Sequence, residues 1–315
     1  MFTSFTIVTV LAICSIAHAW TGAVVEVYDV EQKNINYEGI IWYDNKLYTG
    51  TTRGVNIFRI DPGDLKTGEA AKVDGTSESA TDLTAHYILG LCYSDDKEAI
   101  YATFTSGTGE DEGGIIMFDK DELKFQELVK FQNITNANDC IVSDEQKAIY
   151  ATSSVTGVVM SCDLDLSSCE EYVSGGTLVP SGEPVFSSAF GANGIEYFDD
   201  SDAPYLIVGN LDAGSLTKVA VSGTAGSRSM TTVTVSDPLN LMSGVTNPLR
   251  GADGLTRVGD DVLIVVTAAR VILLTSDDDF VTAKIQKVVS TGFIETDGSA
   301  VAALKYGDRA SKSDI

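Results

Sequence analysis

The sequence has few basic residues, two histidines and, beyond its first segment, no long apolar run. Its 315 residues include 21 Lys and Arg against 45 Asp and Glu, which gives a formal net charge of −24. Such an acidic surface repels nucleic acid and anionic membranes, so we expect neither as a partner. No later segment is long and apolar enough to cross a bilayer. Because 44% of the residues are hydrophobic and no linker interrupts the chain, we expect one domain with a large core.

Residues 1–19 are expected to be a secretory signal peptide. An apolar run at residues 5–13 precedes Ala17-His18-Ala19, a small-x-small cleavage site, although no Lys or Arg comes before that run. The run is short for a membrane span. The mature domain, residues 20–315, is then secreted into the extracellular space. If the secretory route is eukaryotic, the sequon that begins at Asn133 is a glycosylation acceptor.

Four of the five cysteines remain in the mature chain, and an even number in a secreted protein indicates disulfides. Cys162 and Cys169 flank a short segment, so they are expected to link the two arms of a hairpin. Whether Cys92 and Cys140 pair stays open. No histidine neighbours any of these cysteines in the sequence, which argues against a redox or nucleophilic role.

An internal repeat gives the strongest signal of the fold. Residues 89–103 align without a gap on residues 138–152, a shift of 49 (138 − 89). A shorter phrase, Gly-Ala-Asn-Gly-Ile at 191–195, returns as Gly-Ala-Asp-Gly-Leu at 251–255. Each unit holds four short strand-like segments separated by turns, which is the content of a propeller blade. A β-sandwich would not explain a repeat of about 50 residues.

The repeat predicts an all-β fold, a six-bladed β-propeller. The sixth unit is too short for four strands, so a strand at residues 23–28 is expected to complete it and close the ring. Closure removes the exposed sheet edges that invite aggregation. Equivalent residues start the six units, and these are Glu38, Leu89, Asn138, Asn193, Asp253 and Ser299.

Four of these starting residues carry an oxygen donor that suits a hard cation. In a propeller the first strand of each blade lines the central channel, so equivalent positions converge on the axis. Two carboxylates and two amides suit Ca²⁺, with water or substrate completing the coordination, and another divalent cation is possible. Zinc would be expected to recruit cysteine or histidine, which none of these positions holds. The predicted metal ligands are Glu38, Asn138, Asn193 and Asp253.

At these positions the sequence resembles the gluconolactonase, regucalcin and diisopropylfluorophosphatase family of six-bladed propellers. The resemblance spans essentially the whole mature chain. It implies that the four residues hold a central calcium and that Asp253 is also the catalytic carboxylate. It therefore implies a calcium-dependent hydrolase of small-molecule lactones or related esters. The matching motifs are Glu38-Gly39 followed by Trp42, Asn138-Asp139, Asn193-Gly194 and Asp253-Gly254.

One departure and two alternatives limit this interpretation. Sugar-directed members of the family resemble one another in an arginine two residues before the first ligand asparagine, where this chain has Asn136, so a sugar lactone is not favoured. A non-catalytic propeller that binds a small molecule or a protein, with calcium in a structural role, stays open. So does a strictosidine-synthase-like propeller, which would need no calcium. The sequence leaves open whether the protein is an enzyme, its substrate and its oligomeric state.

Other polar residues near the unit starts are expected to have structural roles. Ser299 has no accompanying His–carboxylate pair and is not expected to be a nucleophile. His86, three residues before Leu89, is expected in an exposed loop. Aspartates recur six positions after four of the starts, a spacing typical of hairpin turns rather than of catalysis. These aspartates are Asp44, Asp95, Asp144 and Asp199.

Overall fold

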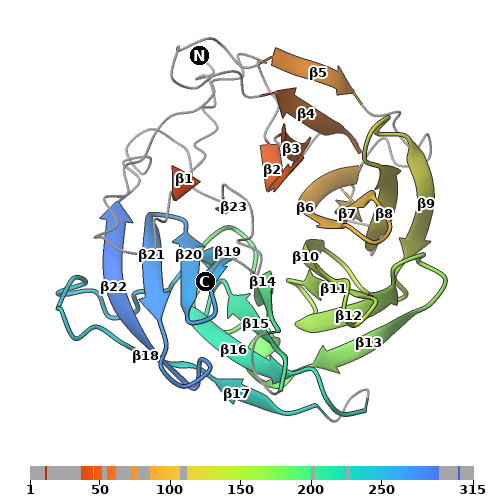
Figure 1. Cartoon of the computed structure of the whole chain (residues 1–315). Helices are drawn as coiled ribbons and strands as arrows, with labels where there is room; N and C mark the ends of the chain where they lie inside the picture. Colours follow the sequence, from red (N-terminus) through yellow and green to blue (C-terminus); the bar gives the residue numbers. More distant parts are fainter. Residues whose placement is uncertain are drawn as a thin grey trace.

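Four-stranded antiparallel sheets surround a common axis like the blades of a propeller (Figure 1). The computed structural model describes residues 11–12, 37–44, 46–51, 55–61, 72–76, 86–106, 112–199, 203–224, 228–290 and 304–305. Five blades lie within these residues. The all-β propeller predicted from the repeat is therefore confirmed.

Each blade is a meander in which consecutive strands pair, with the first strand near the axis and the fourth at the rim (Figure 1). The first blade comprises β2 (Tyr37–Tyr43), β3 (Lys46–Thr51), β4 (Ile57–Asp61) and β5 (Lys72–Thr76). The second comprises β6 (His86–Ser94), β7 (Ala99–Ser106), β8 (Gly113–Asp119) and β9 (Phe125–Lys130). The third comprises β10 (Ala137–Ser143), β11 (Ala148–Ser153), β12 (Val158–Asp163) and β13 (Cys169–Ser174).

The fourth and fifth blades share an element at their outer edge. The fourth comprises β14 (Ala192–Phe198), β15 (Tyr205–Asn210), β16 (Ser215–Ala220) and β17 (Met230–Thr232). The fifth comprises β19 (Ala252–Gly259), β20 (Val262–Thr267), β21 (Arg270–Thr275) and β22 (Thr282–Ser290). Between them, β18 (Thr234–Ser236) leaves the fourth blade and pairs in parallel with β22, the outer strand of the fifth.

The sixth unit falls largely outside the described residues, and so do Ser299 and residues 23–28. In the described part, β1 (Leu11–Ala12) pairs in parallel with β23 (Leu304–Lys305). The count of six blades and closure by a strand at residues 23–28 therefore stay predictions.

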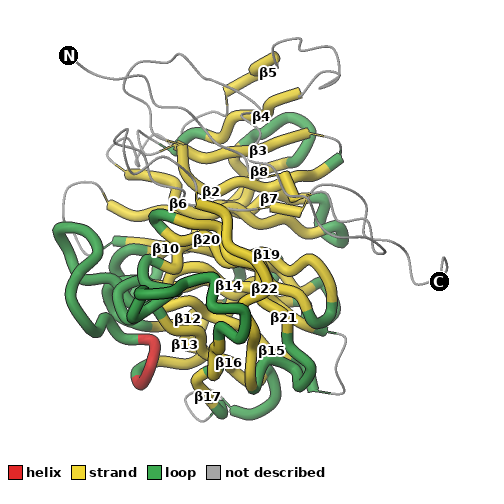
Figure 2. The backbone as a smooth tube through the Cα atoms, turned by 90° about the vertical axis from the view of Figure 1, so that its left-hand side faces the viewer, coloured by secondary structure: helices red, strands yellow, loops and turns green. Residues whose placement is uncertain are grey.

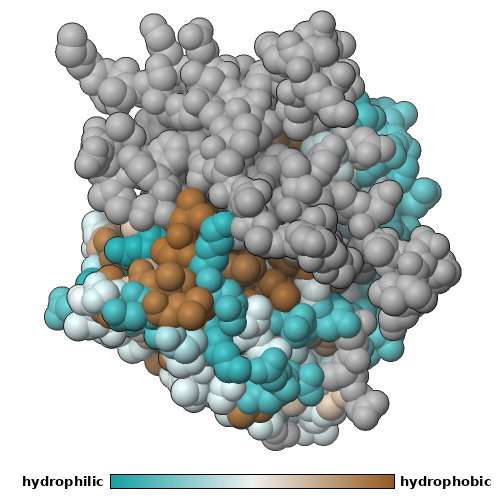
Figure 3. Space-filling view, turned by 60° about the vertical axis from the view of Figure 1, so that its left-hand side comes forward, coloured by the Kyte–Doolittle hydropathy of each residue, from teal (hydrophilic) through white to brown (hydrophobic). Residues whose placement is uncertain are grey.

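An apolar face on the fifth blade favours a further blade. Because side chains alternate across a strand, Leu263 and Val265 pack in the core shared with the fourth blade, whereas Ile264 and Val266 face the other way. These two and Val271 form a separate cluster on the opposite face. Figure 3, which brings this side of the ring forward, has hydrophobic side chains gathered beside the residues drawn in grey. These three side chains are at most 2% exposed, as expected of a face against which a further blade packs.

The loops at one end of the ring include the connection from β13 to β14. It begins with the 3₁₀ helix η2 (Gly176–Leu178), which projects to one side of the molecule (Figure 2). Among the described residues, no helix is long and apolar enough to cross a membrane. The side chain of Asn133, the residue that would be glycosylated, is exposed.

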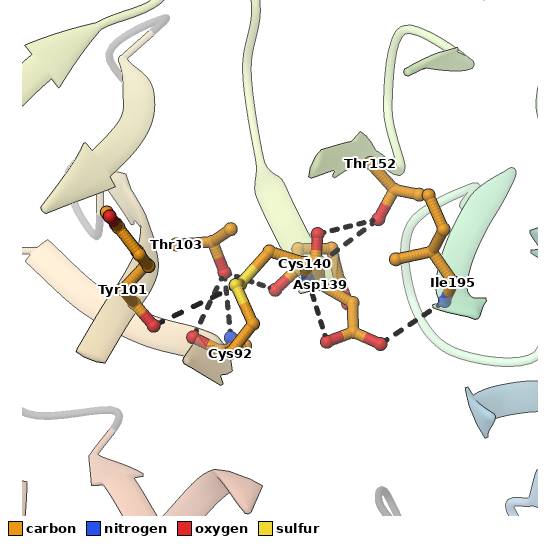
Figure 4. Close-up of a disulfide and its surroundings, with 9 residues drawn as sticks. Cys92, Tyr101, Thr103, Asp139, Cys140, Thr152 and Ile195 are labelled. Carbon is orange, nitrogen blue, oxygen red and sulfur yellow. Dashed lines mark hydrogen bonds between the residues drawn. A yellow bond between two sulfur atoms is a disulfide. The ribbon is translucent and has the colours of Figure 1, made fainter. Parts of the chain in front are cut away.

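Four cysteines form two disulfides, Cys92 with Cys140 and Cys162 with Cys169. Cys162 and Cys169 occupy opposite positions of β12 and β13, which confirms the predicted hairpin link. Cys92 and Cys140 join β6 to β10, the first strands of adjacent blades, with their Cα atoms 5.7 Å apart (Figure 4). This second pairing depends on the contact between blades, which is why the sequence alone left it open.

Replacing Cys92 and Cys140 by alanine is expected to destabilise the protein more than replacing Cys162 and Cys169. The first disulfide closes a segment with a sequence separation of 48 residues and the second one of 7. Loop-closure entropy then predicts losses of about 4 and about 2.5 kcal/mol in the free energy of unfolding. Denaturant unfolding of the two double variants measures both. A larger loss for the hairpin pair would contradict this order.

Candidate functional site

The predicted ligand residues lie at β-bulges in the first strands of their blades. Pairing with the second strand shifts register at this point in β2, β6, β10, β14 and β19. In β10, β14 and β19, two residues of the first strand lie opposite a single residue of the second strand. Asn138, Asn193 and Asp253 are each the first residue of such a pair. Leu89 is the extra residue of β6, and Glu38 directly precedes the irregularity of β2. Since bulges re-aim side chains, the five positions share one local geometry at one end of the channel.

Glycines at the bulges let neighbouring first strands approach closely. A Cβ atom at Gly90 would lie 2.5 Å from the carbonyl oxygen of Asn138, on the next blade. At Gly194 it would lie 2.0 Å from the carbonyl oxygen of Asp253. Gly39, at φ +66°, faces Gly90 in the same way. Any side chain at these positions would push the inner strands apart and separate the predicted ligands.

Two equivalent threonines connect the inner strands. The Thr103 hydroxyl accepts the amide of Gly90 on its own blade and donates to the carbonyl oxygen of Asn138 on the next. The Thr152 hydroxyl accepts the amide of Asp139 and donates to the carbonyl oxygen of Asn193. Thr103 and Thr152 are 49 residues apart, the shift of the sequence repeat. These repeated threonines therefore hold the backbone carbonyl groups of two predicted ligands, Asn138 and Asn193, in equivalent positions.

Asp139 is a further acidic residue at this site that sequence analysis did not assign. Its Oδ1 accepts the amide of Cys140, at 2.9 Å, and its Oδ2 accepts the amide of Ile195 on the fourth blade, at 3.3 Å (Figure 4). Burial raises the pKa of Asp139 to about 7, against the lowering effect of these two amides. The adjacent Asn138-Asp139 pair was the available signal, since a bulge of two residues places both beside the axis.

The acidic residues interact with one another across the ring. Burial raises the pKa of Asp253 well above its usual range, and the charges of Glu38 and Asp139 raise it further. A hydrogen bond with the Asn193 side chain acts in the opposite direction. Burial also raises the pKa of Glu38 to about 7. Asn193 therefore contacts Asp253, and Glu38 and Asp139 lie within electrostatic range of it, while Asn138 lies on the adjoining bulge.

The site has the features expected of a cation site. Asn193 is 3% exposed, and its Oδ1 has no hydrogen-bond partner among the described residues. No Lys, Arg or His of the described chain is among the influences on the pKa values of Glu38, Asp139 and Asp253. Buried carboxylates without a counter-charge are costly, and they bind either protons or a cation. The unpaired amide oxygen and the all-oxygen donor set both fit calcium.

The predicted ligand set is not a group of acidic residues alone. Among the described residues, no three His, Cys, Asp or Glu side chains gather closely enough to hold a metal ion by themselves. The set predicted here draws on two carboxylates and two amides, so its assignment depends on Asn138 and Asn193 as well as on Glu38 and Asp253.

The prediction for His86 is wrong. The residue begins β6, is 6% exposed, and its Nε2 lies 3.0 Å from Glu112 Oε2. Its ring also contacts Phe104 edge-on. The strand extends three residues before the bulge, because His86 pairs with Ser106 in the same sheet. His86 therefore packs within the second blade and contacts Glu112, and it does not lie in an exposed loop.

The comparisons with known proteins identify the fold. No protein-family profile matches the sequence, and no curated protein does either. Among solved structures, the major Malassezia sympodialis allergen Mala s 1 is similar with a TM-score of 0.64 at 16% identity, over 87% of this chain and 84% of that one.

Two further structures are similar at lower identity. A chain of the nidogen/laminin complex has a TM-score of 0.56 at 11% identity, covering 87% of this chain and 86% of that one. A functionally unknown protein from Desulfotomaculum acetoxidans has a TM-score of 0.54 at 11% identity, covering 84% and 74%. At these identities the likeness supports the propeller fold alone, and it carries no activity over to this chain.

Metal-free protein is expected to lose stability as the pH rises from about 4.5 to 7. The folded-state pKa values of Glu38 and Asp139 are raised to about 7 from ordinary values of 4.5 and 3.8, so the folded state holds protons in this window that the unfolded state has released. The unfolding free energy then falls with pH, by a few kcal/mol for each group as an order of magnitude.

Urea unfolding in the presence of a chelator at pH 4.5, 5.5 and 7 measures this loss. Asp139→Asn is expected to reduce it, whereas Glu170→Gln, at an exposed position of β13, should leave it unchanged. Stability that stays constant or rises with pH in the metal-free protein would contradict the burial of these carboxyl groups.

Proposed function

We propose that the protein is a secreted, calcium-dependent hydrolase of lactones or related esters, with its active site at the bulge end of the propeller axis. The observation that carries the proposal is the desolvated carboxyl group of Asp253, which is hydrogen-bonded to Asn193, feels the charges of Glu38 and Asp139, and has no cationic side chain of the described residues among the influences on its pKa. Glu38, Asn138, Asn193 and Asp253 would hold the calcium ion. When bound, calcium polarises a carbonyl or phosphoryl oxygen as a Lewis acid.

Asp253 is the residue best placed to carry the reaction. Its carboxylate either removes a proton from a water molecule or attacks the substrate carbonyl directly. The hydrogen bond with the Asn193 side chain orients this carboxylate, and the bulge fixes the backbone of both residues. Asp139, held by two backbone amides from adjacent blades, is a positioning residue that keeps β10 and β14 in register.

Two buried polar atoms next to the site have no partner within the described chain. Asn136 precedes the bulge of β10, and its Oδ1 is buried and unpaired within the described chain. Ser154 donates its backbone amide to the carbonyl oxygen of Asn136, and its own hydroxyl is likewise buried and unpaired. Because leaving such groups desolvated is costly, their presence beside the bulge of β10 supports a functional role for this end of the channel.

Three exposed apolar side chains lie in the loops at this end of the propeller, which favours esters or lactones with an apolar portion. Val155 and Phe186 are each 44% exposed, and Val179 is 36% exposed. The Val179 backbone packs against Gly157 and Gly191, directly before the start of β14. Exposed apolar side chains close to a site commonly serve binding.

The disulfides support the secreted location. Both pairs link cysteines of the mature domain, and disulfides persist mainly in oxidising compartments outside the cytosol.

The second candidate is a propeller without catalytic activity that binds an apolar small molecule or a protein at the same rim, with calcium as a structural ion. The exposed side chains of Val155, Val179 and Phe186 favour it as much as they favour an ester substrate. One of the similar structures is a nidogen/laminin complex, an instance of this fold in a protein assembly. A strictosidine-synthase-like propeller, the third alternative, would require no calcium.

Asp253→Asn is expected to abolish turnover and to leave the fold intact. Asparagine keeps the size and an oxygen donor but cannot accept the proton or form the ester intermediate, so kcat should fall by about a thousandfold or more. Hydrolysis of a panel of lactones, aryl esters and organophosphates in saturating calcium measures the effect.

The matched control is Asp261→Asn, an exposed position on the same blade that should keep full activity. If the wild-type protein hydrolyses no member of the panel, the binding alternative replaces the hydrolase.

Removing calcium is expected to lower the melting temperature of the wild-type protein by several degrees. A ligand that binds only the folded state at about 100 times its Kd contributes about 2.7 kcal/mol. Differential scanning fluorimetry with calcium and with a chelator measures the shift, which Asn193→Ala should greatly reduce. An unchanged melting temperature on chelation would count against the metal site.

A further inference from the structure

The connection from β13 to β14 contains a short loop, residues 185–190, whose two ends bind the same carboxylate. Asp212 Oδ1 accepts the backbone amide of Val185, at 2.8 Å, and its Oδ2 accepts that of Phe190, at 2.6 Å. The Asp212 amide donates in turn to the carbonyl oxygen of Phe190, at 3.1 Å. Asp212 lies in the turn between β15 and β16 and is 3% exposed. A buried side chain therefore closes this loop at both ends.

A second set of contacts holds the chain just before the loop against the fifth blade. The Arg250 guanidinium donates to the carbonyl oxygen of Glu183, at 3.0 Å, and to that of Pro184, at 3.4 Å. A Cβ atom at Gly251 would lie 3.8 Å from Val185 Cγ1. The loop thus reaches from the start of the fourth blade to the start of the fifth.

The loop lies beside the two strands that carry Asn193 and Asp253. It ends directly before Gly191, two residues before Asn193, and its other end contacts Gly251, two residues before Asp253. The backbone of Leu211 bridges the two strands, because its amide donates to the carbonyl oxygen of Gly191 and its carbonyl oxygen accepts the amide of Gly251. The loop, the β15–β16 turn and the starts of both ligand-bearing strands are therefore one hydrogen-bonded assembly.

The middle of the loop faces solvent. Residues 186–189 are all exposed, and Phe186 is 44% exposed. The Phe186 ring contacts Phe190 edge-on, with the ring centroids 6.5 Å apart. A rigidly held loop that presents an aromatic side chain is typical of binding sites, because a preformed loop avoids the entropic cost of ordering when a ligand binds.

We propose that residues 185–190 are a specificity loop of the bulge-end site, which selects lactones or esters that carry an aryl or similarly bulky apolar substituent. Phe186 contacts that substituent, and Asp212 is the positioning residue that holds the loop beside Asn193 and Asp253. The inference rests on the proposed function, since it names the part of the protein that selects the substrate.

Two pairs of compounds measure this selection in saturating calcium. γ-Butyrolactone and γ-phenyl-γ-butyrolactone report turnover by the full chain, and the two corresponding lactams, which resist hydrolysis, report affinity in an NMR titration. We expect the wild-type protein to favour the phenyl compound about tenfold in both measurements. Phe186→Ala should reduce this preference by about three- to tenfold.

The matched control is Phe125→Ala, the same change at a residue that is 41% exposed. Phe125 begins β9, at the opposite end of the second blade from the bulge, so this variant should keep the full preference. If Phe186→Ala keeps it too, or if neither lactam binds the wild type, the specificity loop is wrong. If the lactams bind with this preference and neither lactone is hydrolysed, the proposed hydrolase is wrong and the loop assignment stands.

Asp212→Asn tests the positioning role. An asparagine presents an NH₂ group to one of the two backbone amides, so the loop loses a charge-assisted hydrogen bond. Chymotrypsin cleavage after Phe186 or Phe190, followed by mass spectrometry on protein that circular dichroism shows to be folded, should become about tenfold faster. KM for the phenyl lactone should rise by a larger factor than kcat falls. Unchanged cleavage would contradict the role of Asp212.

Two further variants complete this test. Asp278→Asn makes the same change at a carboxylate that accepts the amide of Thr282 in a turn at the other end of the fifth blade, and it should leave cleavage of the loop unchanged. Arg250→Ala releases the chain before the loop and should speed cleavage about threefold, a result that decides the question if Asp212→Asn does not fold. Cleavage of Arg250→Ala at the wild-type rate would show that these contacts do not hold the loop.

Discussion

The first strands of adjacent blades lie so close together that a single Cβ atom would separate them. Gly39, Gly90 and Gly194 meet the backbone of the next blade within distances that no side chain allows. This contact decides the diameter of the channel, and the channel diameter decides which side chains face each other across it. A wider ring would leave Glu38 and Asp253 too distant to influence each other, as they do here. The candidate site is therefore a consequence of how tightly the blades pack at the axis.

The same packing is related to the lack of a positively charged partner for the acidic side chains near the axis. A bulge in each of these strands turns one or two side chains out of the regular alternation. The carboxyl groups of Asp139 and Asp253 are held there by backbone amides and by an amide side chain, all of which come from strands that the ring itself fixes. The desolvated carboxyl groups lower the stability of the fold at this place, and such a local cost is common at functional sites.

The fold was predictable from the sequence because the repeat indicates both the strands within each blade and the equivalent positions of neighbouring blades. The shift of 49 residues aligns Thr103 with Thr152, and these two hydroxyls make equivalent links between blades. The role of Asp139 was harder to predict, since it depends on the amide of Ile195, which is 56 residues away and on another blade. His86 was misplaced because its partner Glu112 lies 26 residues further along the chain. The role of Asp212 was not foreseen, because it depends on the amides of Val185 and Phe190 in the preceding connection.

The links between blades are of different kinds around the ring. A disulfide joins β6 to β10, and β18 leaves the fourth blade to become an edge of the fifth. Between the third and fourth blades, the inner strands are connected by hydrogen bonds from Thr152 to Asn193 and from Ile195 to Asp139. The second and third blades thus form one mechanical unit and the fourth and fifth another. The junction between these units is itself well connected, because the Tyr172 hydroxyl donates to the carbonyl oxygen of Val221 and the Arg228 guanidinium donates to the carbonyl oxygen of Tyr172. The second to fifth blades are therefore expected to resist opening as one continuous arc.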